Sequence, residues 1–147
     1  MTIVEQVARA RASGDWNAMI ASVPYARFLG VTLEEKDGSL VGRMKFADHL
    51  VGNPTLPALH GGTLGALLEL AAQFELMYRA QTLMLPKTIT LTIDYLRSGR
   101  AVDTFVRAKT VRQGRRVATV HTWAWQEDES QPVAQATVKQ LVMGVIT

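Results

Sequence analysis

The chain has 147 residues, of which 48% are hydrophobic and 20% charged, and it contains no cysteine. A chain of this length builds one ordinary domain, and without cysteine it has no disulfide framework, thiolate zinc site or cysteine nucleophile. Sixteen Lys and Arg residues against thirteen Asp and Glu residues give a net charge of +3. The arginines are scattered along the chain, so this excess does not predict a nucleic-acid surface, although it suits a phosphate-bearing small molecule.

The segment Met1-Thr2-Ile3-Val4-Glu5 lacks the basic and then apolar build of a signal peptide. No apolar run in the chain is long enough to cross a bilayer. The lack of cysteine also fits a reducing compartment. Together these features predict a soluble, cytoplasmic protein that does not contact a membrane.

The N-terminal residues predict short helices. The run Thr2-Ile3-Val4-Glu5 has the spacing of a capping box and places a first helix at about residues 2–12. Asp15 can cap a second short helix, which Pro24 should stop. We expect residues 1–24 to form a helical extension that acts as a lid or brace.

From Phe28 the pattern changes to that of strands. Asp37-Gly38 lies between two short alternating segments and favours a tight hairpin turn. Residues 48–59 contain two prolines and little periodicity, which predicts a loop. This loop leads into a long helix at about 61–81. One stripe of that helix is apolar and should face the core: Leu64, Leu67, Leu68 and Ala71.

After Pro86 the side chains alternate with period two, which is typical of strands. The alternation begins at Thr88, and we expect three further strands at about 101–112, 115–127 and 132–145. Helices, a hairpin, one long helix and an antiparallel meander make a single α+β domain over residues 1–147, with the long helix on one sheet face. The other side of that helix then needs cover, which a second copy of the chain would supply.

The start of the long helix carries the features of a hydrolytic site. His60-Gly61-Gly62 opens the helix, whose first N–H groups have no intrahelical partner and lie at the positive end of the dipole. Glu69 is the one ionisable residue between His60 and Glu75, and a carboxylate among apolar residues is costly unless it faces a cleft or a partner. Small and polar residues should share its face and allow a ligand or backbone to approach: Gly65, Ala66, Ala72 and Gln73.

The loop containing Asn53, the His60-Gly61-Gly62 motif and Glu69 resemble hotdog-fold thioesterases, specifically the phenylacetate-degradation-type acyl-CoA thioesterases. Later stretches extend the resemblance over about residues 25–145: Thr90-Leu91-Thr92-Ile93-Asp94-Tyr95-Leu96-Arg97, Gln113-Gly114-Arg115-Arg116 and Ala134-Gln135-Ala136-Thr137. The resemblance implies a hotdog fold, a long central helix packed against a curved antiparallel sheet. It also implies hydrolysis of an acyl-CoA thioester to a free acid and CoA, without a metal or redox cofactor.

The same resemblance implies residue roles. Glu69 would be the nucleophile or general base, and the Gly61 N–H group would bind the carbonyl oxygen. His60 and Asn53 would shape and polarise the site, and Gln73 could orient the carboxylate or a water molecule. Asn53 lies one residue further from the histidine than the pattern expects, and that group commonly has Asp in place of Glu69. A homodimer is implied, or a tetramer of two dimers, with each site shared between the acid of one chain and the oxyanion donor of the other.

Arginine binds phosphate bidentately, so three arginines near the motifs are candidates for the CoA phosphates: Arg97, Arg115 and Arg116. His121 alternates with Trp123 and Trp125 along a strand and is expected to be structural.

Two alternatives remain open. The segment His49 to Pro57 resembles the His-Phe-Pro-Gly-x-Pro segment of hydroxyacyl-carrier-protein dehydratases, where the histidine is the base, but the His-Gly-Gly motif is foreign to that family. A non-catalytic hotdog module that binds acyl-CoA would keep the pocket but would not need Glu69. The presence of Glu69 argues against that module. Separately, Glu69 could be a structural carboxylate facing a donor of the second chain.

Overall fold

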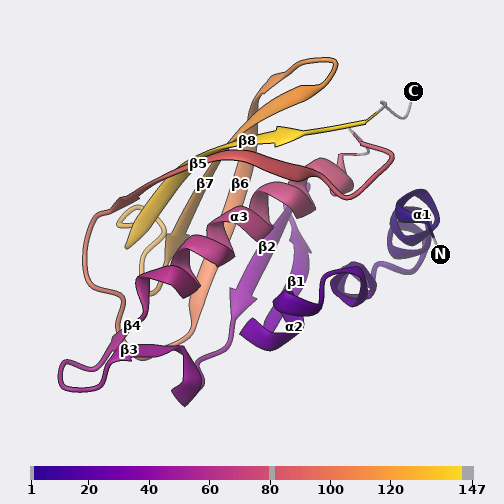
Figure 1. The fold of residues 1–147 in the computed structure, drawn as a ribbon. Helices are drawn as coiled ribbons and strands as arrows, with labels where there is room; N and C mark the ends of the chain where they lie inside the picture. The colour runs from indigo at the N-terminus through magenta and orange to yellow at the C-terminus, as the bar shows by residue number, and fades with distance from the viewer. Residues whose placement is uncertain (1, 80–81, 144–147) are drawn as a thin grey trace.

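A computed structural model describes residues 2–79 and 82–143. Its long helix α3 (Gly61–Tyr78) lies across one face of a six-stranded antiparallel sheet with the order β1-β2-β6-β7-β8-β5 (Figure 1). The sheet curves around this helix, as the hotdog resemblance predicted. The strands are β1 (Val31–Lys36), β2 (Ser39–Met44), β5 (Lys87–Tyr95), β6 (Thr104–Gln113), β7 (Val117–Trp125) and β8 (Ala134–Leu141).

The N-terminal helices are α1 (Ile3–Ser13), the 3-10 helix η1 (Trp16–Ser22) and α2 (Pro24–Leu29). The predicted capping box is present at the start of α1, and the Asp15 side chain caps η1. The second helix ends at Ser22, before Pro24, as expected, but the third helix was not predicted. Pro24 begins α2, and the first helical position tolerates it because the missing N–H group would have no intrahelical partner there.

Helices α1 and η1 pack at the C-terminal end of α3. The Arg11 guanidinium donates to the Tyr78 carbonyl at 2.5 Å, and the Trp16 ring meets the Tyr78 ring edge-on at 4.7 Å between centroids. Trp16 is 2% exposed and belongs to the same hydrophobic cluster as the helix. The extension therefore contributes to the core.

The hairpin between β1 and β2 turns at Asp37 (φ 53°) and Gly38 (φ 74°), as the sequence predicted. The prediction of a plain loop at 48–59 is wrong. This segment contains the 3-10 helix η2 (Asp48–Leu50) and the short strands β3 (Val51–Asn53) and β4 (Ala58–Leu59), which pair with each other. Strands of three and two residues are too short to show a period in the sequence.

The long helix was predicted to reach residue 81, but it ends at Tyr78, with Arg79 as its C-cap. Residues 80 and 81 lie outside the described residues, as do the last two positions of the strand predicted at 132–145. The four long strands after α3 were predicted in the right order. Their observed bounds differ from the predicted ones by up to four residues, which is common for element boundaries.

Strand β5 forms one edge of the sheet and pairs only with β8 among the described strands. Its side chains Ile89 and Tyr95 are 53% and 54% exposed. A long edge strand with exposed apolar residues is a template for pairing with another chain. Within the described residues, no helix is long and apolar enough to span a membrane.

Candidate active site

His60 is the N-cap of α3, and its ring is fixed by the helix that it begins. The Gly62 N–H group donates to Nδ1 of His60 at 2.8 Å, so the neutral ring carries its proton on Nε2. The His60 carbonyl accepts from the Thr63 hydroxyl at 2.6 Å and from the Thr63 N–H group at 3.0 Å. The Gly61 N–H group has no hydrogen-bond partner among the described residues. One free donor therefore remains at the positive end of the helix.

Strand β5 crosses the start of α3 closely, with two of its side chains packed against Gly61 and Gly65. A Cβ atom on Gly61 would lie 3.3 Å from the Tyr95 ring, and one on Gly65 would lie 2.8 Å from Cδ1 of Ile93. The Tyr95 hydroxyl donates to the Gly61 carbonyl at 2.8 Å. These contacts hold the first turn of the helix against the sheet.

Glu69 lies on the one stripe of α3 that is not buried. Beyond its first two glycines, every residue of α3 is buried except Ala66, Glu69 and Gln73. Their spacing of three and four residues puts them on one line that continues back to Gly62. The Glu69 carboxylate makes no hydrogen bond or ion pair with any residue that the structure describes. The helix thus presents an unpaired carboxylate on its open stripe.

The two sides of this face differ in exposure. Gly65 lies under Ile93 and lets strand β5 approach, as expected of a small residue, whereas Ala72 is fully buried. At 100° per residue Gly65 and Ala72 flank Glu69 by about 40° and 60° on one side, which is buried, whereas Ala66 and Gln73 flank it by similar angles on the other side, which stays open. The small residue on the open stripe is Ala66.

Asn53 and Gln73 make structural hydrogen bonds close to the helix. The Asn53 side chain accepts from the Thr55 N–H group at 3.0 Å and so closes a turn in the β3–β4 loop. The Gln73 amide donates to the Pro86 carbonyl at 3.0 Å, which ties α3 to the segment before β5. Their catalytic roles stay predictions.

Gly52 was not expected to matter, yet it sets the position of the motif histidine. A Cβ atom at Gly52 would lie 2.7 Å from Cα of His60 and 3.1 Å from its ring carbon Cδ2. The pairing of β3 with β4 brings the two backbones this close. A glycine in a three-residue strand carries no sequence signal for such a contact.

The other two histidines are engaged elsewhere. The His49 Nε2–H group donates to the Phe28 carbonyl at 3.0 Å, and the ring packs against the Phe28 ring. His49 thus ties η2 to α2. His121 stacks on Trp123 at 5.4 Å between centroids on β7, which agrees with the expected structural role.

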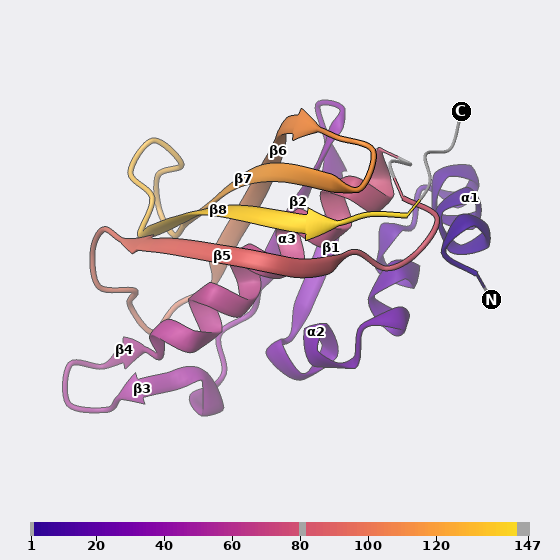
Figure 2. The same cartoon turned by 45° about the horizontal axis from the view of Figure 1, so that its top comes forward.

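The three candidate arginines lie at opposite ends of the sheet. Arg97 follows β5 and donates to Gln131 at 2.7 Å, whereas Arg115 and Arg116 form the β6–β7 hairpin (Figure 2). The register places the hairpin level with the start of β5, about 25 Å from its other end. Within one chain, one phosphate group therefore cannot contact both ends.

Arg112 and Lys139, which the sequence analysis missed, join the hairpin arginines around one open hollow. The cluster Arg112, Arg115, Arg116 and Lys139 has no acidic residue in its lining. None of the four has an ion-pair partner within the described chain, whereas Arg43, Arg79, Arg100 and Arg107 each pair with a carboxylate. Only strand pairing brings Lys139 beside residues more than twenty positions away.

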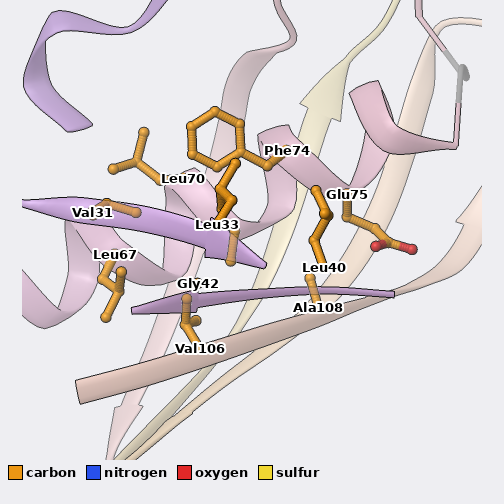
Figure 3. Close-up of a pocket in the computed structure, with 11 residues that line it drawn as sticks. Val31, Leu33, Leu40, Gly42, Leu67, Leu70, Phe74, Glu75, Val106 and Ala108 are labelled. Atoms are coloured by element: carbon orange, nitrogen blue, oxygen red, sulfur yellow. The ribbon is translucent and has the colours of Figure 1, made fainter. Parts of the chain in front are cut away.

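A small apolar pocket lies on the opposite side of α3 from Glu69, between the helix and strands β1, β2 and β6 (Figure 3). Its volume of about 10 Å³ leaves room for roughly one water molecule. The Glu75 side chain lies at one end of this pocket, and its carboxylate accepts from Nε of Arg79 at 2.9 Å. The pocket is too small for an acyl group. Nowhere in the described chain do three or more His, Asp or Glu residues gather as they would around a metal ion.

Residues 52–140 match the family model of the acyl-CoA thioesterase N-terminal domain. The chain belongs to this family. It is therefore a thioester hydrolase, and the match supports the predicted hydrolase rather than the dehydratase or the non-catalytic module. The resemblance stated from the motifs is confirmed.

Known proteins agree with this assignment. The chain is 29% identical to the medium/long-chain acyl-CoA thioesterase YigI of Escherichia coli over 135 residues, which cover 82% of this chain and 86% of YigI. A solved Chromobacterium violaceum protein is 32% identical with a TM-score of 0.76, over 97% of this chain and 99% of that one. A phenylacetic acid degradation-related protein of Ralstonia eutropha is 28% identical with a TM-score of 0.72, over 82% and 90% of the two chains. The fold is the predicted hotdog.

Proposed function

We propose that this thioesterase hydrolyses acyl-CoA with Glu69 as nucleophile or general base and the Gly61 N–H group as oxyanion donor. One observation carries the proposal. Nearly all side chains of α3 are buried, but the Glu69 carboxylate is partly exposed and unpaired, and the Gly61 N–H group has no hydrogen-bond partner in the described chain. Hydrolysis builds negative charge on the carbonyl oxygen, and a preorganised N–H group stabilises that charge. An ionised carboxylate either attacks the carbonyl carbon or removes a proton from the attacking water.

Each site combines Glu69 of one chain with Asn53, His60 and Gly61 of a second chain. Within one chain, Gly61 and Glu69 are eight residues apart, or about 12 Å along the helix axis. This spacing favours two chains as the source of the groups that act on one carbonyl. The exposed edge of β5, which runs beside α3, offers the surface on which a second copy would pair.

The acyl group then lies along the open stripe of α3, between the two copies. The pocket on the other side of the helix holds roughly one water molecule, so it does not compete for this role. A homodimer or a tetramer of two dimers is compatible with this arrangement. YigI is named for medium and long acyl chains, and we extend that preference to this chain as part of the proposal.

The basic cluster at the β6–β7 hairpin binds the phosphates of CoA. None of its members has an ion-pair partner in the described chain: Arg112, Arg115, Arg116 and Lys139. A phosphate can therefore bind them without breaking an existing ion pair. Replacing Arg115 and Arg116 with Gln should raise KM for acyl-CoA without lowering kcat. The matched control replaces Arg9 and Arg27, two exposed arginines on the N-terminal helices, and should leave KM unchanged. An unchanged KM in the hairpin variant would remove the cluster from the proposal.

The shared site is tested with two inactive variants. Glu69→Ala removes the carboxylate, and Gly61→Pro removes the N–H donor at the first helical position, which tolerates proline. After the two variants are unfolded and refolded together, half of the dimers are mixed, and each mixed dimer holds one intact site. Activity, followed as free thiol released from short-chain, long-chain and aromatic acyl-CoAs, should return to about a quarter of wild type.

Gly61→Ala is the control for this experiment. It adds a Cβ atom beside Tyr95, as proline does, but keeps the N–H group. It should therefore retain most of the activity. If both inactive chains fold and co-assemble but activity does not return, each site lies within one chain.

A further inference from the structure

Tyr95 and His60 are joined by a chain of hydrogen bonds through one peptide group. The Tyr95 hydroxyl donates to the Gly61 carbonyl at 2.8 Å. The N–H group of the same peptide belongs to Gly62 and donates to Nδ1 of His60, also at 2.8 Å. The chain runs in one direction, from the phenol through the peptide to the imidazole, and it ends at the Nε2–H group of His60.

We propose that Tyr95 is a positioning residue that prepares the His60 Nε2–H group as a second donor to the thioester carbonyl oxygen. This inference rests on the proposed function, because it takes His60 and Gly61 to lie at the reacting carbonyl. Hydrogen bonds in series polarise one another, so donation to the Gly61 carbonyl strengthens the bond from Gly62 to His60. That bond in turn holds the proton of the neutral ring on Nε2.

The surrounding backbone confines the ring to this orientation. A Cβ atom at Gly62 would lie 2.9 Å from Nδ1 of His60, and one at Gly52 would lie 3.1 Å from Cδ2. The backbone at Gly52 and at Gly62 therefore contacts the His60 ring directly, at distances that leave no room for a side chain at either position. Nε2 makes no hydrogen bond within the described residues, so its proton is available to a substrate. A donor whose ring is already held in place costs no reorganisation when the oxyanion forms.

Packing alone would not require the Tyr95 hydroxyl. The ring covers Gly61 and lies against the start of α3, and phenylalanine would keep this contact. Tyr95→Phe therefore separates packing from donation. Tyr25→Phe is the matched control, because Tyr25 is also about half exposed and lies in α2, where its ring stacks on Phe28.

Steady-state hydrolysis of acyl-CoA gives the first measurement. Removal of one hydrogen bond in the chain should lower kcat roughly three- to tenfold and leave KM nearly unchanged. Tyr25→Phe should retain wild-type values of both. Thermal unfolding of both variants shows whether each remains folded.

Nitrogen-15 NMR gives the second measurement, which does not depend on activity. The chain has three histidines, so the imidazole signals are few, and His60→Gln assigns those of His60. In Tyr95→Phe the Gly62 amide proton should move upfield, and the His60 nitrogens should shift toward a mixture of tautomers. The signals of His49 and His121 should stay in place.

Three results would overturn the inference. A wild-type kcat in Tyr95→Phe means that the chain does not serve the reaction. Unchanged Gly62 and His60 signals mean that the chain does not position the ring, even if kcat falls. An equal loss of kcat in Tyr25→Phe means that the effect is general. Failure of the proposed function would appear differently, as wild-type turnover in Glu69→Gln, and the NMR shifts would still report whether the chain exists.

Discussion

Helix α3 carries two glutamates in opposite situations. Glu75 is 4% exposed, and Arg79 one turn later donates to its carboxylate at 2.9 Å. That arginine also donates to the Gly38 carbonyl at 3.0 Å, so the pair ties the helix to the β1–β2 hairpin. Glu69 lies six residues earlier on the open stripe, half-buried, with no partner in the described chain.

The difference separates a carboxylate that serves stability from one that is free to serve chemistry. A buried charge must be paired, and a carboxylate with its partner in place has little left to offer a substrate. A carboxylate that is unpaired on the open stripe makes no bond within its own described chain. A substrate or a second subunit can therefore contact it without displacing a partner. Exchanging either glutamate for glutamine should therefore affect one property and spare the other.

The largest effect is expected at Glu69. Glutamine keeps the shape of the side chain but can neither attack as an anion nor accept a proton. Glu69→Gln should lower kcat by about a hundredfold or more, since general-base catalysis alone contributes about that much. The free energy of unfolding should stay within about 0.5 kcal/mol of wild type, because no contact in the described chain is lost.

Thiol release and denaturant unfolding on the same preparation measure both quantities. Near-normal turnover in a folded Glu69→Gln protein would end the proposed mechanism. A large loss of stability would instead place Glu69 among the structural residues, with Glu75.

The opposite outcome is expected at Glu75. Glu75→Gln leaves the Arg79 guanidinium without its anion, although that side chain is 44% exposed and can be hydrated. The variant should lose about 1–3 kcal/mol of unfolding free energy, as expected when a buried acceptor is weakened. Its kcat per folded molecule should remain near wild type. A fall in kcat comparable to that of Glu69→Gln would break the comparison between the two residues.

The smallest effect sharpens the comparison with a third carboxylate, Asp103, which lies in the connection before β6. Its carboxylate accepts from the Phe46 N–H group at 2.7 Å and pairs with the Arg43 guanidinium. The Phe46 N–H group, and then Arg43, lower the pKa of Asp103 below its ordinary value of 3.8. Because the folded-state pKa is lowered, the stabilisation is complete above the ordinary value and is lost as the pH falls through the lowered one.

Asp103→Asn should therefore cost about 1 kcal/mol or less at pH 7, and the difference from wild type should vanish in strongly acidic solution. Urea unfolding at several pH values measures this. A cost that stays constant down to the most acidic pH would show that shape, rather than charge, stabilises this connection. Turnover at pH 7 should not change.

Local signals in the sequence predicted the helices well. The capping box at Thr2, the Asp15 cap and the His60-Gly61-Gly62 start of α3 all depend on residues within three positions of each other. The Asp37-Gly38 turn was equally clear, since both positions adopt positive φ angles that favour such residues. Such caps and turns can be predicted from sequence because the contacts that define them join residues close together in the chain.

The sequence predictions failed where the local structure depends on contacts between distant segments. Strands β3 and β4 are too short to show a period, and they exist because they pair with each other. Ala72 was expected on an open face with Glu69, but it is fully buried, and the sequence does not show how much of the helix its neighbours cover. The second helix ends before Pro24 as expected, but the helix that begins at Pro24 was not predicted, because a proline is compatible with both a helix end and a helix start.

The sequence by itself determined the fold class, the order of the long elements and the motif that identifies the family. These depend on periodicity and on short spacings, which the chain carries in every conformation. Only the tertiary structure decided that Glu69 is unpaired while Glu75 is not, that Tyr95 reaches Gly61 across 34 positions, and that Lys139 joins the hairpin arginines. Pairing, burial and the direction of a hydrogen bond are properties of segments brought together by folding, and no local pattern encodes them.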